Sequence, residues 1–171
     1  MDAEYTKELK NGYLTETGVA KLKFIDGFPQ KLAKEFNEAT PGLSTKQSRS
    51  IFDIVNRLYS RLARKDVTIE EIKIELGMIK SMINDKVNKG SIPKSFLDFF
   101  SANVEAINTV EDFKVFKLHF ESICNYLKDD KPKAQNNGGG NSGFRGNGSG
   151  NYGNRPNNGQ NNRNGYNNFR R

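Results

Sequence analysis

Three copies of one short pattern predict where helices begin in this chain. A serine or threonine is followed three residues later by Gln, Glu or Asp at 44–47, 68–71 and 109–112. In such a capping box each side chain accepts a hydrogen bond from the other residue's backbone N–H, so two otherwise free donors at the helix start are satisfied. Each pattern precedes apolar residues at the spacing of one helix face. No stretch keeps the alternation of a half-buried strand, so the sequence predicts an all-α fold.

Five helices are predicted, and the connections between them are short. They span about 29–39, 45–65, 69–88, 94–107 and 110–128, with Pro29 and Pro93 suited to a first helical position. Short connections and aromatic-rich faces favour a compact bundle over residues 27–133. Gly77 interrupts one helix at a cost of about 1 kcal/mol relative to alanine, which indicates a close helix crossing. Residues 1–26 are weakly patterned and are expected to form a partly irregular N-terminal arm.

The composition changes completely at Ala134. Residues 134–171 contain ten glycines, thirteen asparagines and five arginines, but no lysine and no acidic residue. Such a segment cannot bury enough apolar surface to offset the entropy that ordering costs, so a disordered C-terminal tail is predicted. The whole chain has a net charge of +7, and the tail accounts for most of it. This balance favours an anionic partner.

The helix predicted at 45–65 has an apolar face and, beside it, a cationic stripe. The core-facing residues are Ile51, Ile54, Val55, Leu58, Tyr59 and Leu62, and the cationic residues are Lys46, Arg49, Arg57, Arg61, Arg64 and Lys65. Asp53 is the only acid in the stripe. Six cations on one side of a helix suit contact with a polyanion. The alternative is a solvated face in which Asp53 pairs with Arg49 or Arg57 one turn away.

Arginines and aromatic residues are spaced along the tail. Aromatic rings stack on unpaired bases, arginines neutralise phosphates, and glycine lets a chain follow a strand. The candidate contacts with nucleic acid are Arg145, Tyr152, Arg155, Arg163 and Tyr166. A tail that only improves solubility is the alternative. The complete absence of acidic residues favours contact with nucleic acid.

The chain offers few residues for catalysis. His119 is its only histidine and Cys124 its only cysteine, and a spacing of five residues separates them by about 140° around a helix. We therefore expect no catalytic pair, no metal and no cofactor, with His119 at the surface or partly buried and Cys124 in the core. The tail glycines lack the spacing of a phosphate-binding loop. The protein is predicted not to be an enzyme.

Three features favour a cytoplasmic location. One cysteine cannot form an intrachain disulfide, and the first ten residues lack the apolar region of a signal peptide. No apolar run approaches the roughly 18 residues that a membrane-spanning helix requires. No membrane partner is expected.

Two segments resemble a known family. Residues 43–52 (LSTKQSRSIF) are similar to the Leu-Thr-Thr/Ser-x-x-x-Arg-x-hydrophobic-aromatic opening of the small subunit of type III-A (Csm) CRISPR–Cas complexes. Residues 116–128 (FKLHFESICNYLK) resemble that family's closing pattern, a Phe-Glu pair followed by a tyrosine. The resemblance extends over about 40–130. The long Asn/Gly/Arg tail departs from the usual family pattern.

The resemblance implies a helical, non-catalytic subunit present in several copies, which helps to assemble an interference complex for antiviral defence. Its partners would be CRISPR guide RNA, target RNA, the repeated backbone subunit, the large subunit and other copies of itself. It would line the groove that holds guide and target RNA and would contact backbone rather than bases. The family arginine maps onto Arg49, whereas Lys46, Arg57 and Arg61 are added from helix geometry.

Two other functions remain open on the residues alone. A helical adaptor would bind proteins through aromatic residues at 96–100 (FLDFF) and through the surroundings of Met78 and Met82, with the tail as a solubilising segment. A stand-alone single-strand-binding protein would act mainly through its tail. In that case the tail alone would bind nearly as well as the whole chain.

Overall fold

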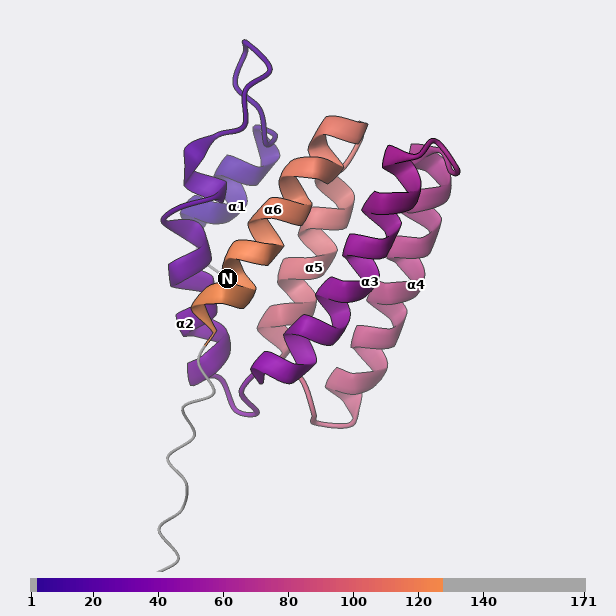
Figure 1. Ribbon diagram of the computed structural model, residues 1–171. Helices are drawn as coiled ribbons and strands as arrows, with labels where there is room; N and C mark the ends of the chain where they lie inside the picture. Colours follow the sequence, from indigo (N-terminus) through magenta and orange to yellow (C-terminus); the bar gives the residue numbers. More distant parts are fainter. Residues whose placement is uncertain (1–2, 128–171) are drawn as a thin grey trace, which may run out of the picture. The chain divides into compact units, whose positions relative to one another are not determined.

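The computed structural model describes residues 3–127, which form six α-helices and one short 3-10 helix (Figure 1). The elements are α1 (Ala3–Lys10), η1 (Leu22–Phe24), α2 (Phe28–Glu38), α3 (Thr45–Ala63), α4 (Ile69–Asn88), α5 (Lys94–Ala106) and α6 (Val110–Tyr126). An isolated bridge between Leu14 and Ala20 is the one β-type pairing in the described part of the chain. The all-α prediction is confirmed. The five predicted helices correspond to α2–α6, and α1 is an addition.

All three predicted capping boxes are formed. At α3 the Gln47 N–H donates to Ser44 Oγ at 3.2 Å, and the Ser44 N–H donates to Gln47 Oε1 at 3.0 Å. The same pair of hydrogen bonds starts α4 and α6. Because the caps fix where each helix begins, the observed starts at residues 45, 69 and 110 agree with the prediction.

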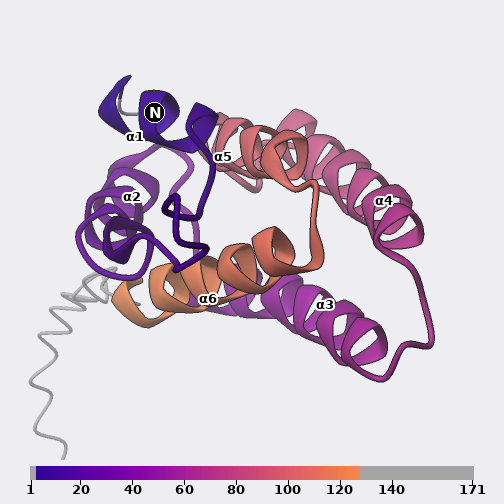
Figure 2. The ribbon, with the colours of Figure 1, turned by 90° about the horizontal axis from the view of Figure 1, so that it is seen from above.

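The helices form two rows with an aromatic core between them. Figure 1 shows α6 between α2 and α3, and Figure 2 shows α4 and α5 across the core from α3 and α6. Ring centroids lie 5.9 Å apart for Phe100 and Phe116 and 6.1 Å apart for Phe99 and Phe120. Phe96, Phe99 and Phe100 are fully buried, so the predicted docking face at 96–100 is wrong. These residues share one face of α5, and that face packs onto α6.

The N-terminal arm contributes more to the core than its sequence pattern indicates. Tyr5 and Leu9 of α1 are buried, as are Tyr13 and Phe24 beyond it. The eight residues of α1 present only two buried apolar side chains, too few for periodicity to predict a helix. Residues 11–21 between α1 and η1 contain turns and no helix. The arm is therefore irregular in part, yet it is packed onto α5 and α6 through aromatic rings.

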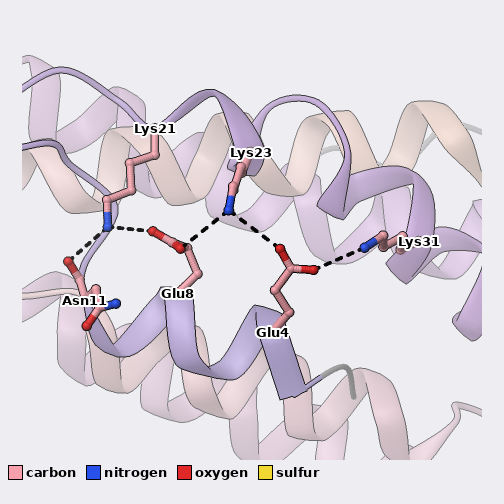
Figure 3. A network of polar contacts seen from close by, with 6 residues as sticks. All are labelled: Glu4, Glu8, Asn11, Lys21, Lys23 and Lys31. Carbon is pink, nitrogen blue, oxygen red and sulfur yellow. Dashed lines mark hydrogen bonds and ion pairs between the residues drawn. The ribbon is translucent and has the colours of Figure 1, made fainter.

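Lysines from the following segment fasten α1 on its outer side (Figure 3). Lys21 lies 2.9 Å from Glu8 and lowers the pKa of that carboxyl group through a hydrogen bond. Lys23 lies 3.6 Å from Glu4 and 3.8 Å from Glu8, and Lys31 of α2 lies 3.4 Å from Glu4. The Lys21–Glu8 pair is half-buried, whereas the pairs of Lys23 and Lys31 with Glu4 are more than half exposed, so each of these two contributes less than about 1 kcal/mol.

A group of polar side chains is buried between α1, α5 and α6. The hydroxyls of Tyr5 and Tyr13 donate to Asn103 Oδ1 at 2.9 and 2.7 Å. His119 Nδ1 donates to the Phe24 carbonyl, and its Nε2 lies 3.2 Å from the Tyr5 hydroxyl. The prediction of a surface or partly buried His119 is wrong, because its side chain is fully buried, and burial lowers its pKa to about 4. The hydrogen-bond partners of His119, Tyr5 and Phe24, belong to the N-terminal arm. Helix periodicity describes one helix at a time, so it could not predict these contacts.

The outward side of α4 carries apolar residues around a glycine. Ile74 and Met78 are 68% and 69% exposed, whereas Met82 is half-buried. A Cβ added at Gly77 would meet no atom within 4 Å, so the close crossing predicted for this position is absent from residues 3–127. Gly77 is therefore not needed for packing within the described part of the chain.

Candidate nucleic-acid interface

α3 lies between α6 and α4, with one face fixed against these two helices (Figure 1). Its buried residues include Ile51, Val55, Leu58 and Leu62. Helix geometry then directs residues 46, 49 and 57 away from the core. Gln47 Nε2 donates to the Ser91 carbonyl at 2.8 Å, which ties the start of α3 to the α4–α5 connection. The outward side chains are thus presented on a helix that is held from both sides.

Lys46, Arg49 and Arg57, here called the α3 outer face, form the first part of the predicted cationic stripe. All three are exposed, and no hydrogen bond or ion pair joins them to another described residue. Asp53 lies one turn from both arginines, yet it pairs with neither. Cations without a partner in their own chain can neutralise phosphates without first breaking an ion pair.

The last part of the stripe differs. Arg61 Nη1 lies 2.7 and 2.9 Å from the two carboxylate oxygens of Glu75 on α4. Arg64 Nε donates to Asp66 Oδ2 at 2.8 Å. Lys65 is exposed just beyond α3, with a φ of 61°. Two of the six predicted cations are therefore neutralised by carboxylates of their own chain.

α6 adds cations beside the α3 outer face that the sequence pattern did not single out. Lys117 Nζ lies 5.6 Å from the centroid of the Phe52 ring and 2.7 Å from Glu121 Oε2. Lys114 is exposed and has no ion pair with any residue of the described range. The apolar composition of 110–128 predicted a central helix, and α6 does lie between α2 and α3 (Figure 1). Its outward residues Lys114 and Leu118 nevertheless reach solvent.

His119 and Cys124, the only histidine and the only cysteine in the sequence, are both buried. Cys124 lies in the core as predicted, and burial raises the pKa of its thiol to about 11. His119 is held in the buried group around Asn103. Within residues 3–127 no three side chains of metal-binding type are grouped together. None of the helices in that range has the length and apolar character needed to cross a membrane.

The tail candidates lie outside the described residues. They are Arg145, Tyr152, Arg155, Arg163 and Tyr166. The predicted disorder of residues 134–171 also falls outside the described range, and both expectations stay predictions.

A match to one known protein family covers most of the described residues. The family model described as Csm2 Type III-A matches residues 20–133. The chain belongs to this family. It is a small subunit of the type III-A CRISPR effector complex and associates with the other subunits of that complex. The resemblance seen at residues 43–52 and 116–128 is thereby confirmed. Neither the curated proteins nor the solved structures contain a significant match.

The Csm2 match includes both parts of the cationic stripe. It covers η1 and α2–α6, so Arg49 and its paired neighbour Arg61 both lie inside it. α1 lies before the matched residues, although its Tyr5 reaches the buried Asn103. The tail from Ala134 onward lies beyond the match.

Proposed function

We propose that this chain is the non-catalytic RNA-binding small subunit of its complex. The α3 outer face would contact the sugar-phosphate backbone of guide and target RNA. The observation that supports this role is the set of exposed, unpartnered cations Lys46, Arg49 and Arg57. The eleven-residue step from Lys46 to Arg57 spans about 16 Å of helix, enough to face several successive phosphates. In an RNA-guided complex base pairing reads the sequence, so backbone contacts are sufficient for the protein.

A non-catalytic role agrees with the state of His119 and Cys124. An imidazole whose pKa is lowered to about 4 stays neutral at pH 7, and a thiol whose pKa is raised to about 11 stays protonated. Both groups are also buried, so a substrate could not reach them without unfolding part of the core. In this proposal they act only in packing and in internal hydrogen bonds.

Contacts with other copies of the same chain form the second part of the proposal. The exposed apolar residues Ile74 and Met78 of α4 support it, because they lie on a different helix from the α3 outer face. Contacts with RNA and contacts between copies could then form at the same time. The proposed location of this assembly is the cytoplasm. Met78→Glu should weaken self-association in sedimentation velocity without unfolding the chain. Self-association equal to that of the wild type would contradict this part.

The RNA-binding part is tested by the salt dependence of affinity. Full-length Lys46→Ala/Arg49→Ala/Arg57→Ala should bind a single-stranded RNA more weakly than the wild type. Its slope of log affinity against log salt should be shallower by about 2, since each neutralised phosphate contributes about 0.7 for single strands. Binding can be followed by fluorescence anisotropy between 50 and 200 mM salt.

The matched control removes the same charge elsewhere. Lys7→Ala/Lys10→Ala/Lys73→Ala takes three exposed lysines from α1 and α4. It should keep nearly the wild-type slope. If both triple variants lose the same affinity and slope, only net charge matters, and the assignment to the α3 outer face is wrong.

The tail residues Arg145, Tyr152, Arg155, Arg163 and Tyr166 are proposed as additional contacts. Replacing Arg145, Arg155 and Arg163 by serine in the full-length chain should reduce the salt slope by up to about 2 as well. Unchanged slope and affinity would show that these tail residues do not contact RNA, and would favour a tail that only improves solubility.

A further inference from the structure

One aromatic ring is exposed at the end of α6. Among the phenylalanines and tyrosines of residues 3–127, Tyr126 alone is exposed, with 41% of its surface open to solvent. The half-buried rings of Phe52 and Tyr59 pack against Phe120 and Phe113. Tyr126 has no ring partner in the described range. Within residues 3–127 every other phenylalanine and tyrosine is buried or half-buried, which leaves Tyr126 as the ring available for an external contact.

Tyr126 forms one wall of a pocket against the outer side of α2. The pocket has a volume of about 440 Å³, within the range of small-molecule sites. The other lining residues are Gln30, Lys31, Lys34, Asn37 and Glu38. Together they offer an aromatic face, two side-chain amides and two ammonium groups. A nucleotide needs the same groups: a surface on which its base can stack, hydrogen-bond partners for the base edge and a cation for its phosphate.

The charge at this pocket favours an anionic occupant. Two lysines, Lys31 and Lys34, and one acid, Glu38, line the pocket. Lys31 also lies 3.4 Å from Glu4, but both side chains are more than half exposed, so this pair is weak. Lys34 lies 3.9 Å from Glu38, with both side chains largely exposed, so the pair is weak and Lys34 can turn to a phosphate. A cationic segment such as the chain's own tail is a poorer match for these lysines than RNA is.

The pocket adjoins the end of the α3 outer face. Phe52 packs on Phe120 and Tyr59 on Phe113, so α3 and α6 run antiparallel. Thr45 Oγ1 donates to the Leu127 carbonyl at 3.5 Å, which places the start of α3 beside the end of α6 (Figure 1). An RNA strand that follows the outer face from Arg57 to Lys46 therefore arrives at the end of the bundle that holds Tyr126.

We propose that Tyr126 and Lys34 form a stacking subsite for one unpaired RNA base and its phosphate. This inference rests on the proposed RNA-binding function and extends it from the backbone to a base. Stacking tolerates any sequence, because every base has a π face. The subsite therefore adds affinity for single-stranded or splayed nucleotides without adding sequence specificity.

The test compares Tyr126→Ala with Tyr126→Phe in the full-length chain, using a uridine-rich single-stranded RNA oligomer. Loss of the ring should weaken binding roughly 5- to 150-fold, the range for one base–aromatic stack. The salt slope should stay unchanged, because no cation is lost. Tyr126→Phe should bind like the wild type, since the ring suffices. Lys34→Ala should instead reduce the slope by about 0.7.

Two further measurements separate stacking from a change in the fold. Leu118→Ala removes another exposed side chain of α6, 37% exposed, and should leave affinity unchanged. The same oligomer with 5-iodouridine should photo-cross-link to Tyr126, as located by mass spectrometry. Wild-type affinity in Tyr126→Ala, or equal losses in Tyr126→Ala and Tyr126→Phe, would overturn the subsite alone. A wild-type chain that binds no RNA would overturn both the subsite and the proposed function.

Discussion

Polar side chains are hydrogen-bonded to one another in the buried group around Asn103, whereas those of the α3 outer face are unpaired within residues 3–127. In the interior, Tyr5 and Tyr13 both donate to Asn103, and His119 bonds to a backbone carbonyl. On the outer face, the cations have no partner in the described chain. Polar groups that are satisfied internally stabilise the fold, whereas unpaired surface cations remain available to an external anion. Substitutions in the two regions should therefore affect different measurements.

α3 repeats this contrast along its own length. Arg49 and Arg57 are unpaired, whereas Arg61 and Arg64 are neutralised by Glu75 and Asp66. The six cations look equivalent on a helix, but two of them are paired with carboxylates, whereas Lys46, Arg49, Arg57 and Lys65 have no ion pair with any described residue.

The largest expected effect is at Asn103. Asn103→Ala leaves the buried Tyr13 hydroxyl without its acceptor and leaves the Tyr5 hydroxyl with His119 Nε2, and a buried unsatisfied group costs about 1 to 3 kcal/mol. The free energy of unfolding in urea should fall by about 2 to 3 kcal/mol, with the RNA salt slope unchanged. Tyr13→Phe removes one hydroxyl and should cost only about 1 kcal/mol. Equal losses for the two variants would contradict the central position of Asn103.

Low pH should lower the free energy of unfolding through His119, which belongs to the same buried group. Burial lowers the pKa of His119 from 6.5 to about 4, so below pH 6.5 the unfolded chain binds a proton that the folded chain does not. The contribution of neutral His119 to the free energy of unfolding is therefore fully present above about pH 6.5. It is lost as the pH drops toward 4, and the loss is roughly 2.5 kcal/mol at pH 4.5. Urea unfolding between pH 7 and 5 avoids most carboxylate titration. His119→Gln should remove this dependence, and a persistent slope in that variant would assign it to other groups.

A smaller gain is expected at Gly77. Because Gly77 is exposed within α4 and a Cβ there meets open space, Gly77→Ala should stabilise the free chain by about 1 kcal/mol. Thermal unfolding measures this gain, and the RNA salt slope should not change. Destabilisation would indicate a contact at Gly77 beyond those of residues 3–127.

The smallest effect sharpens the contrast within α3. Glu75→Gln releases Arg61 from its ion pair, which should cost less than about 1 kcal/mol of stability. If Arg61 can then reach RNA, the salt slope should steepen by up to about 0.7. Glu70→Gln makes the same charge change at an exposed residue of α4. Identical slopes in both variants would show that pairing does not keep Arg61 from RNA.

Features encoded within one or two helical turns could be predicted. Both residues of each capping box lie within one turn, so the starts of α3, α4 and α6 follow from the sequence. The burial of Ile51 and Leu58 follows from the same local spacing. Arg49 and Arg57 were also found in this way, because outward placement depends on helix geometry alone.

Features that depend on how helices pack against each other could not be predicted. Glu75 meets Arg61 only because α3 and α4 pack side by side, and the two residues are fourteen positions apart. His119 is buried by Tyr5 and Phe24, from an arm whose short helix has little periodicity. Tyr126 belongs to the closing pattern of residues 116–128, but its exposure depends on where α2 lies.

The most direct test observes individual arginines in the unmodified protein. Side-chain Nε–H signals of ¹⁵N-labelled full-length chain can be assigned with single Arg→Lys variants and followed as single-stranded RNA is added. If RNA binds the α3 outer face, the signals of Arg49 and Arg57 shift, while those of Arg61 and Arg64 keep their positions. Shifts at Arg61 and Arg64 with none at Arg49 and Arg57, or no shift at any of the four, would contradict binding at this face.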